Sequence, residues 1–360
     1  YTRLGYSYSL ISPFLALEYS SDGGLFLGAR IKSTAQGFRN RPHTLFQYLS
    51  VTRALNSNSY HIKYKGDYAN LFRNTNLAIT GDAQLPTART RFYGIGNNTV
   101  NAPSGADDHS FYLARYNLST LSFSLRNSVN QWLTLKAGPI VQYFSLSANK
   151  NTGKFITTIN PSLPHIAPYG SQFYVGGEGG LEVNTRNDKL FPTRGVSFNA
   201  AAQYYGSLNR QIQGYSQLGA AFSFYTDLLA KNRLVFASAI GGGHTIGDYQ
   251  FYQAQHLGFK QNLRGYRIQR FAGRTRAYNN TELRWKIGEA NLYLLRGPFG
   301  LLGFHDTGRV WADGEKSDTW HTSSGGGVWI APFNKALIAV SFCHSKEERN
   351  LMLLSFGFQF

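Results

Sequence analysis

The strongest constraint in this sequence is an alternation of bulky apolar residues with small or polar ones at a period of two. Between residues 215 and 228, one face carries leucine, alanine and phenylalanine, and the other carries glutamine, glycine, alanine and serine. Such alternation is typical of strands with one greasy and one wet face. No apolar run approaches the roughly 18–20 residues that a membrane-spanning helix needs. The pattern therefore predicts strands throughout the chain.

The composition indicates that this sheet lies in lipid. Aromatic residues make up 15% of the 360 residues, charged residues make up another 15%, and 38 residues are glycine. Soluble proteins average about 25% charged residues. An open sheet edge in hydrocarbon would leave N–H and C=O groups unpaired, so a lipid-embedded sheet must close on itself. We therefore expect an all-β, antiparallel transmembrane β-barrel in a bacterial outer membrane.

Turn signals divide the chain into sixteen predicted strands, an even number as in single-chain bacterial barrels. Segment 109–128 is also compatible with two short strands, which would break this parity. Residues 1–11 are expected to form a periplasmic lead-in and residues 12–360 the barrel. The predicted strands are 12–20, 24–33, 44–56, 58–68, 71–82, 109–128, 132–146, 171–185, 195–205, 215–228, 232–244, 274–287, 299–312, 320–331, 335–345 and 350–360.

The connections between these strands differ greatly in length. Tight turns on one side and long loops on the other are typical of the periplasmic and extracellular ends of such barrels. The short connections are predicted at 69–70, 129–131, 229–231 and 332–334, and the long ones at 83–108, 147–170 and 245–273.

The long segment 245–273 carries a run of positive charge. No acidic residue lies between residues 260 and 276. Such a run would repel itself in solution, and inside a barrel it requires carboxylates. We therefore expect this extracellular loop to fold inward onto acidic wall residues. The basic residues in this segment or just after it are Lys260, Arg264, Arg267, Arg270, Arg274 and Arg276.

Two carboxylates on the following strands are candidates to hold this loop. Glu282 lies on the polar face of strand 274–287, and Asp306 shares a face of strand 299–312 with Phe304 and Gly308. Two carboxylates can grip one arginine guanidinium in a planar, charge-assisted arrangement. These two strands therefore offer inward-facing acids for a loop arginine. In the same register, His305 and Arg309 fall on the opposite, lipid-facing side.

The loop contains the tetrapeptide Leu263-Arg264-Gly265-Tyr266. Gly265 permits a tight turn at the loop tip. Tyr266 offers an aromatic body and a hydroxyl that can pack against the inner wall.

These residues resemble the motifs of a known family. The tetrapeptide is similar to the (V/I/L)RG(F/Y) motif on the sixth extracellular loop of the BamA and TamA outer-membrane assembly factors and bacterial surface antigens. Residues 304–308 (FHDTG) resemble that superfamily's F-x-D-x-G strand motif, and residues 191–195 (FPTRG) resemble its turn before the ninth strand. The resemblance spans roughly residues 10–360. It implies that Arg264 pairs with Asp306 and Glu282 and pins the loop inside the barrel.

The first and last predicted strands indicate a closing seam. Pro13 cannot donate a ladder hydrogen bond, so a weakly paired seam could accept a client strand by β-augmentation. The family resemblance implies such a lateral gate, although Pro13 is equally compatible with merely marking where the wall begins. The alternation also places Phe356, Phe358 and Phe360 on one face of the last strand, as in the terminal insertion signal of outer-membrane barrels.

The formal net charge of +17 favours anionic partners. Outer-membrane lipids and lipopolysaccharide are the expected ones, although unspecific loop and lumen charge also accounts for it. Nucleic acid is not an expected partner, because no recognition helix, RNP pattern or zinc spacing accompanies the basic residues. The chain has no hydrolase, metalloprotease or P-loop motif, and its single cysteine, Cys343, excludes a disulfide framework. We therefore expect no enzyme activity, cofactor or metal.

Three functions are compatible with the sequence. The first is insertion or translocation of client polypeptides through the lumen or the lateral seam. The second is a membrane anchor or export barrel for a fused N-terminal domain, a phosphoesterase or a lipase, absent from this chain. Residues 91–99 (RFYGIGNNT) favour it by resembling a loop in relatives that follow a metallophosphoesterase domain. The third is a passive, anion-preferring pore.

Overall fold

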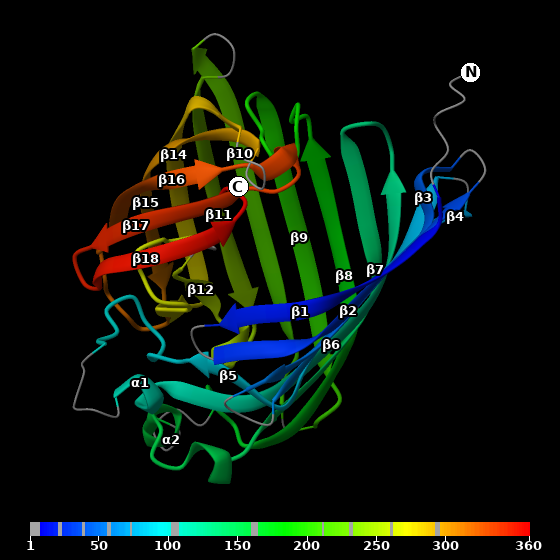
Figure 1. Cartoon of the computed structure of the whole chain (residues 1–360). Coiled ribbons are helices and arrows are strands. Elements are labelled where there is room, and N and C mark those ends of the chain that lie inside the picture. The colour runs from blue at the N-terminus through cyan, green and yellow to red at the C-terminus, as the bar shows by residue number, and fades with distance from the viewer. Residues whose placement is uncertain are drawn as a thin grey trace. The chain divides into compact units, whose positions relative to one another are not determined.

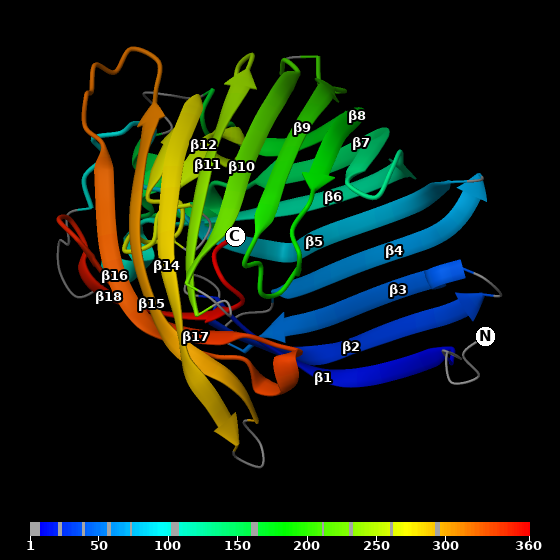
Figure 2. The same cartoon turned by 90° about the horizontal axis from the view of Figure 1, so that it is seen from above.

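The computed structural model describes residues 8–20, 24–37, 40–55, 59–72, 74–101, 108–159, 165–210, 212–229, 233–259, 262–291 and 296–360. Within these residues, sixteen strands form one sheet in sequence order, with β11 followed directly by β14. The printed strand pairs are antiparallel, and Figure 2 shows β1 to β5 following one another across the sheet. A separate two-stranded ribbon pairs β12 with β13.

The elements have the following bounds. The short helices are α1 (Asp108–Phe111) and α2 (Phe155–Ile159), with 3-10 turns η1 (Asn149–Asn151), η3 (Phe251–Gln253) and η4 (Pro332–Asn334). The strands are β1 (Leu10–Ser20), β2 (Gly24–Gly37), β3 (Asn40–Ala54), β4 (Tyr60–Phe72), β5 (Thr75–Arg91), β6 (Leu113–Ser128), β7 (Leu133–Leu146), β8 (Gly170–Asn184), β9 (Gly195–Ser207), β10 (Tyr215–Leu229), β11 (Leu234–Ile246), β12 (Gln255–Leu257), β13 (Phe271–Gly273), β14 (Thr275–Asn291), β15 (Arg296–Trp311), β16 (His321–Ile330), β17 (Ile338–Ser345) and β18 (Arg349–Phe356).

The chain divides into two compact units. The first comprises residues 1–91, 105–181 and 202–216, and contains β1 to β7. The second comprises residues 92–104, 182–201 and 217–360, and contains β11 to β18. In the second unit β14 to β18 run side by side (Figure 1).

Burial along the strands is inverted relative to a soluble sheet. On β6, Leu121, Phe123 and Leu125 are 37–44% exposed, whereas Ser122 and Ser124 between them are only 5% and 4% exposed. On β14 the outward Trp285 is exposed, while Glu282 is fully buried on the opposite face. A wall that turns its apolar side chains outward and its polar ones inward is suited to lipid on the outside.

The helices contribute little to the fold. In the described part of the chain, none of them has the length and apolar character required to span a lipid bilayer. They lie in the connections that follow β5, β7, β11 and β16.

Several predicted boundaries need correction. The predicted turn at 69–70 is wrong, because β4 continues to Phe72. Asn70 has a positive φ of 56° within a register shift between Tyr68 and Phe72, so its turn-like signal marks a β-bulge. The predicted loop 83–108 begins too early, since β5 extends to Arg91 across a second register shift. Segment 109–128 forms one strand, β6, preceded by α1, and the two-strand alternative is wrong.

β7, which pairs with β6, approaches it closely at a glycine. A Cβ built on Gly138 of β7 would lie 1.8 Å from the backbone oxygen of Phe123 and 2.8 Å from the Cα of Ser124. Any side chain there must push the two backbones apart. Gly179 on β8 gives the contrasting case, because a Cβ there meets nothing within 4 Å.

We predict that Gly138→Ala destabilises the sheet by about 1–3 kcal/mol, the usual cost of overpacking. Gly179→Ala should leave the free energy of unfolding nearly unchanged. Urea unfolding of the protein in lipid vesicles, followed by gel mobility without boiling, measures both. Equal stability of the two variants would contradict the close approach.

Candidate functional site

The connection between β11 and β14 covers one face of the strands that follow it. We call this face of β14 to β17 the loop-covered face. Leu257 and Phe271, from the β12–β13 ribbon, pack with Leu263, Tyr266 and Val310 in a buried apolar cluster. Contacts join β12 to both β14 and β15 (Figure 1). The segment is therefore packed against the wall rather than free in solvent.

Arg264 is the centre of this interface, which we call the Arg264 clasp. Its Nε donates to Oδ2 of Asp306 at 2.7 Å, and its Nη2 donates to Oδ1 at 2.6 Å, forming a bidentate pair. Its Nη1 donates to Oε1 of Glu282 at 2.5 Å, and its backbone N–H also donates to Asp306 at 3.0 Å. The guanidinium carbon stacks 3.8 Å from the Phe304 ring centroid. The structure thus brings together the residues proposed for the clasp.

A second arginine, not predicted for this role, completes the charge balance. Arg284 Nε donates to Oε2 of Glu282 at 2.7 Å. The Arg264 and Arg284 side chains are both 3% exposed, and Glu282 and Asp306 are 0% exposed. Two cations and two carboxylates therefore form a neutral, fully buried cluster. Burial of unpaired charges would cost several kcal/mol per ion, so each member depends on the others.

The same cluster holds the C-terminal residues, which corrects one prediction. β18 ends at Phe356, and Gly357 has a positive φ of 107°. Phe358 and Phe360 therefore do not continue the exposed face of Phe356, which is 78% exposed. Arg284 lies 4.0 Å from the Phe358 ring centroid, and its Nη2 donates to the Phe360 carbonyl at 3.0 Å. The break at Gly357 turns these two aromatic rings toward the buried cations.

The small residues at this site are explained by close packing. Gly265 has a φ of 83°, and a Cβ there would lie 2.8 Å from the Ser323 side chain. At Gly308 a Cβ would lie 3.1 Å from Leu257, so this glycine lets the β12 ribbon approach β15. Tyr266 is 1% exposed, and its hydroxyl donates to the Thr322 carbonyl at 3.3 Å.

The electrostatics favour a permanently charged loop arginine. Burial alone would lower the pKa of Arg264, but its hydrogen bonds to Asp306 and the negative charge of Glu282 outweigh burial and raise that pKa above its ordinary value. Arg264 therefore stays charged across the physiological pH range.

The other loop cations find acids that sequence reasoning missed. Arg267 pairs with Glu348 at 2.9 Å, and Arg270 pairs with Glu347 at 3.3 Å, both from the β17–β18 turn. Arg274 pairs with Asp313 at 2.5 Å. Arg276 donates instead to the His256 carbonyl at 2.9 Å, and Lys260 lies outside the described residues. These acids follow distant strands, so only the excess of loop cations indicated that such partners exist.

Segment 92–101 joins the same assembly. The Asn97 backbone N–H donates to Glu315 at 2.6 Å, and the Asn97 carbonyl accepts from Nε2 of His321 at 2.9 Å. Nδ1 of His321 lies 2.7 Å from Glu347, and its ring stacks on Phe271 at 3.7 Å. The loops after β5, β11 and β15 are therefore locked together.

The remaining predicted positions are less informative. Pro13 is exposed and lies on β1, opposite Ile31 of β2 in the register. β1 and β18 are the first and last strands in the sheet order. His305 is exposed on the outer side of β15, as predicted, and Arg309 is partly buried there over the Trp311 ring. The gate itself stays a prediction.

Comparisons with known proteins identify the family. The model of the Omp85 superfamily domain matches residues 49–360. The chain belongs to the Omp85 superfamily. A comparison with curated proteins finds no match.

Solved structures agree on the fold of this Omp85 chain. BamA from Haemophilus ducreyi lacking POTRA domains 1–3 matches with a TM-score of 0.69 at 16% identity, over 97% of this chain and 70% of that chain. CdiB from Escherichia coli matches with a TM-score of 0.61 at 10% identity, over 96% of this chain and 61% of that chain. CdiB from Acinetobacter baumannii matches with a TM-score of 0.56 at 10% identity, over 98% of this chain and 66% of that chain. The chain thus spans less than two thirds of either CdiB chain.

Membership of Omp85 confirms the predicted fold and location. The protein is a sixteen-stranded, antiparallel outer-membrane β-barrel of a Gram-negative bacterium, with the long loop after β11 folded inward. The loop-covered face is therefore the lumen face. The family turn motif at 191–195 lies directly before β9, and its Phe191 ring contacts Trp329 and Phe358. Assignment to the branch fused to a metallophosphoesterase stays a prediction.

We predict that Arg264→Ala lowers the free energy of unfolding by about 3–5 kcal/mol, because it leaves two buried carboxylates with one cation. Arg274→Ala is a matched control on the same segment, since its partner Asp313 is 59% exposed. That variant should lose at most about 1 kcal/mol. Heat-modifiable gel mobility and protease resistance of residues 247–273 measure the effect. Similar behaviour of the two variants would contradict a buried clasp.

We also predict that Arg284→Ala releases the C-terminal residues, because a buried cation–π contact contributes about 2 kcal/mol. Hydrogen exchange of the peptide covering 355–360 should become at least about tenfold faster. Lys286→Ala, two residues along the same strand, provides the control, because Lys286 pairs with the exposed Glu289. Unchanged exchange in the Arg284 variant would show that Phe358 and Phe360 are held by other contacts.

Proposed function

We propose that this Omp85 barrel inserts or translocates client polypeptides, using the lumen and the seam between its first and last strands. The observation that carries this proposal is the Arg264 clasp, which fixes a long loop on the lumen wall by a neutral, buried cluster. A loop fixed there occupies lumen space and supports a shaped polar path instead of an unobstructed pore.

The polar lumen face supports handling of an extended chain. On β9, Asn199 is exposed and Gln203 is half-buried, and both share the face of the buried Ser197 and Tyr205. Their amide groups can exchange hydrogen bonds with a passing backbone. The outer face is apolar and does not offer them. A client segment would therefore travel along the inner wall.

The seam supports the insertion half of the proposal. A terminal strand has a row of backbone groups that a client strand can pair with by β-augmentation. Pro13 lacks an N–H, so β1 cannot form a complete ladder on both of its edges. An incomplete seam is easier to open than a complete one. Residues 1–11, which precede or begin β1, are proposed to lead in from the periplasm.

Client polypeptides and outer-membrane lipids, including lipopolysaccharide, are the proposed partners. No catalysis is proposed for this chain. A fused N-terminal phosphoesterase or lipase domain and a passive anion-preferring pore remain the alternatives, and the following experiment separates them from the machine.

We predict that the chain, reconstituted in liposomes, speeds insertion of a urea-unfolded small outer-membrane barrel at least severalfold over protein-free liposomes. Arg264→Ala should lose this acceleration, whereas Arg274→Ala should retain it. Protease protection of the client reports insertion. An uncatalysed rate together with large, steady, anion-selective conductance would contradict the proposal and favour the pore. An uncatalysed rate without such conductance would favour the anchor.

Photo-crosslinking then distinguishes the two routes. A crosslinker at Leu15 on β1 tests the seam, one at Tyr278 on β14 tests the lumen, and one at the outward-facing Trp285 provides the control. Client adducts at Leu15 alone indicate lateral insertion, and adducts at Tyr278 indicate passage through the lumen. Adducts at Trp285 alone would exclude both routes.

A further inference from the structure

Two arginines on the outer face of the first unit have no counter-ion among the residues that the structure describes. Arg89 of β5 and Arg115 of β6 are directly opposite in the register. Residues opposite each other on antiparallel strands have Cβ atoms about 4.5–5.5 Å apart, and like charges there are destabilising. The Nε atoms of both side chains are buried without a hydrogen-bond partner. Within the described residues, neither guanidinium meets an acceptor or a carboxylate.

The Arg89–Arg115 pair lies on the lipid-facing side of the sheet. Arg115 has the same strand parity as Leu121, Phe123 and Leu125, the lipid-facing residues of β6, and the register of β6 with β7 runs without a shift between them. Arg115 lies two residues inside the start of β6, after one of the long extracellular loops. The pair therefore faces the outer leaflet at headgroup level.

A third cation lies beside the pair. Lys150 Nζ, from the loop after β7, donates to the Pro86 carbonyl of β5 at 3.1 Å. The neighbouring Asn151 side chain bonds both the N–H and the carbonyl of Arg115, at 2.8 Å each. This loop is therefore anchored next to the pair and adds positive charge to it.

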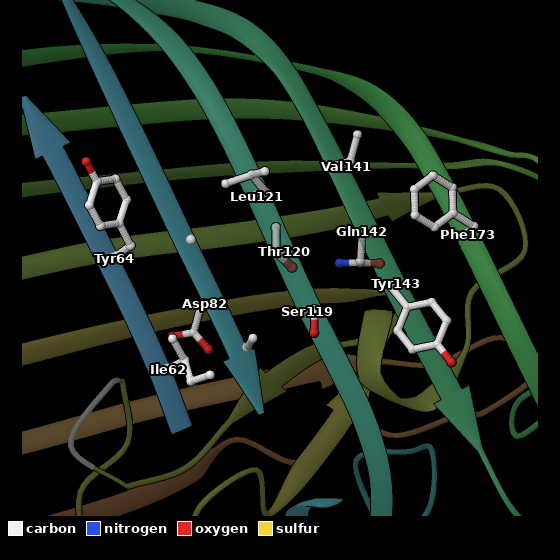
Figure 3. A pocket seen from close by; sticks show the side chains of 12 residues that line it. Ile62, Tyr64, Asp82, Ser119, Thr120, Leu121, Val141, Gln142, Tyr143 and Phe173 are labelled. Carbon is white, nitrogen blue, oxygen red and sulfur yellow. The ribbon is translucent and has the colours of Figure 1, made fainter. Parts of the chain in front are cut away.

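An apolar notch opens below the arginines on the same outer face. It has a volume of about 290 Å³, and the small residues Gly81 and Ser119 lie among its lining. Figure 3 shows Tyr64, Leu121 and Tyr143 around it. The one carboxylate of the lining, Asp82, pairs with His61 on the other face of the sheet.

The spacing of charge and notch fits one class of ligand. Four residues separate Arg115 from Ser119, which corresponds to about 13 Å along the strand. A phosphate between two guanidiniums gains bidentate, charge-assisted hydrogen bonds and relieves the repulsion between them. An acyl chain attached to the same headgroup would reach the notch. Because an anionic head and an apolar chain are both required, the complementary molecule is a phosphorylated glycolipid of the outer leaflet.

We propose that Arg89, Arg115 and Lys150 bind the phosphate of an outer-leaflet glycolipid, whose acyl chain lies in the notch at Gly81 and Ser119. This site is distinct from the Arg264 clasp. It deepens the lipid-partner part of the proposed function, and its test does not involve client handling. It gives the barrel a defined lipid contact on the outer face of β4 to β8.

The test measures binding of bis-phosphorylated lipid A to the purified chain in neutral detergent by native mass spectrometry. Arg89→Gln or Arg115→Gln should each weaken binding about tenfold, and the double variant should weaken it further. Arg210→Gln, an exposed arginine in the β9–β10 loop, provides the matched control and should bind normally. Equal binding by the double variant and the control would overturn the phosphate site.

The apolar half of the site has its own variant. A Cβ on Gly81 would lie 3.5 Å from Leu121, an ordinary contact, so Gly81→Leu is compatible with the backbone and fills the notch. It should weaken lipid A binding severalfold while leaving heat-modifiable mobility unchanged. Unaltered binding by Gly81→Leu would overturn the placement of the acyl chain.

Two further probes separate the lipid from a free phosphate. Dephosphorylated lipid A should bind at least about tenfold more weakly than lipid A. Inorganic pyrophosphate should compete only at concentrations far above those of lipid A. Effective competition by pyrophosphate at equal concentration would overturn the glycolipid assignment, because the headgroup anion alone would then account for binding.

Discussion

The structure depends on a set of buried charges that must be satisfied together. Arg264 enters the lumen wall on a loop, and its two carboxylate partners come from adjacent strands, β14 and β15. Arg284 balances the remaining charge and also contacts the C-terminal aromatic rings. Removing any one charge leaves the buried cluster with an uncompensated charge, and this mutual dependence couples the loop, the wall and the chain end.

This coupling gives the loop a role beyond filling space. Loops of this length usually hold a single conformation only when their polar groups find partners. Here the clasp is reinforced by the Arg267–Glu348, Arg270–Glu347 and Arg274–Asp313 pairs of the same segment. Any rearrangement of the lumen that a client requires must therefore leave these bonds intact or break several of them at once.

The sequence allowed the strands and the clasp to be predicted because both follow from local patterns. A two-residue period specifies which face each side chain takes, so the alternation alone places Glu282 and Asp306 on the inner wall. The pairing of Arg264 with them came from the family resemblance. The predictions that were wrong concern local departures from strict alternation. Asn70 marks a bulge within β4. Gly357 turns Phe358 and Phe360 away from the face that strict alternation assigns them. The partners of Arg267, Arg270 and Arg274 lie in turns tens of residues away, and only packing selects them.

The central claim is that Arg264 and Asp306 act as one buried unit, and a double-mutant cycle tests it most directly. Unfolding free energies of the native protein, Arg264→Ala, Asp306→Ala and the double variant in lipid vesicles give their coupling energy. The account predicts a coupling at the upper end of the usual range, about 2–3 kcal/mol. Additive losses, with a coupling energy near zero, would contradict it.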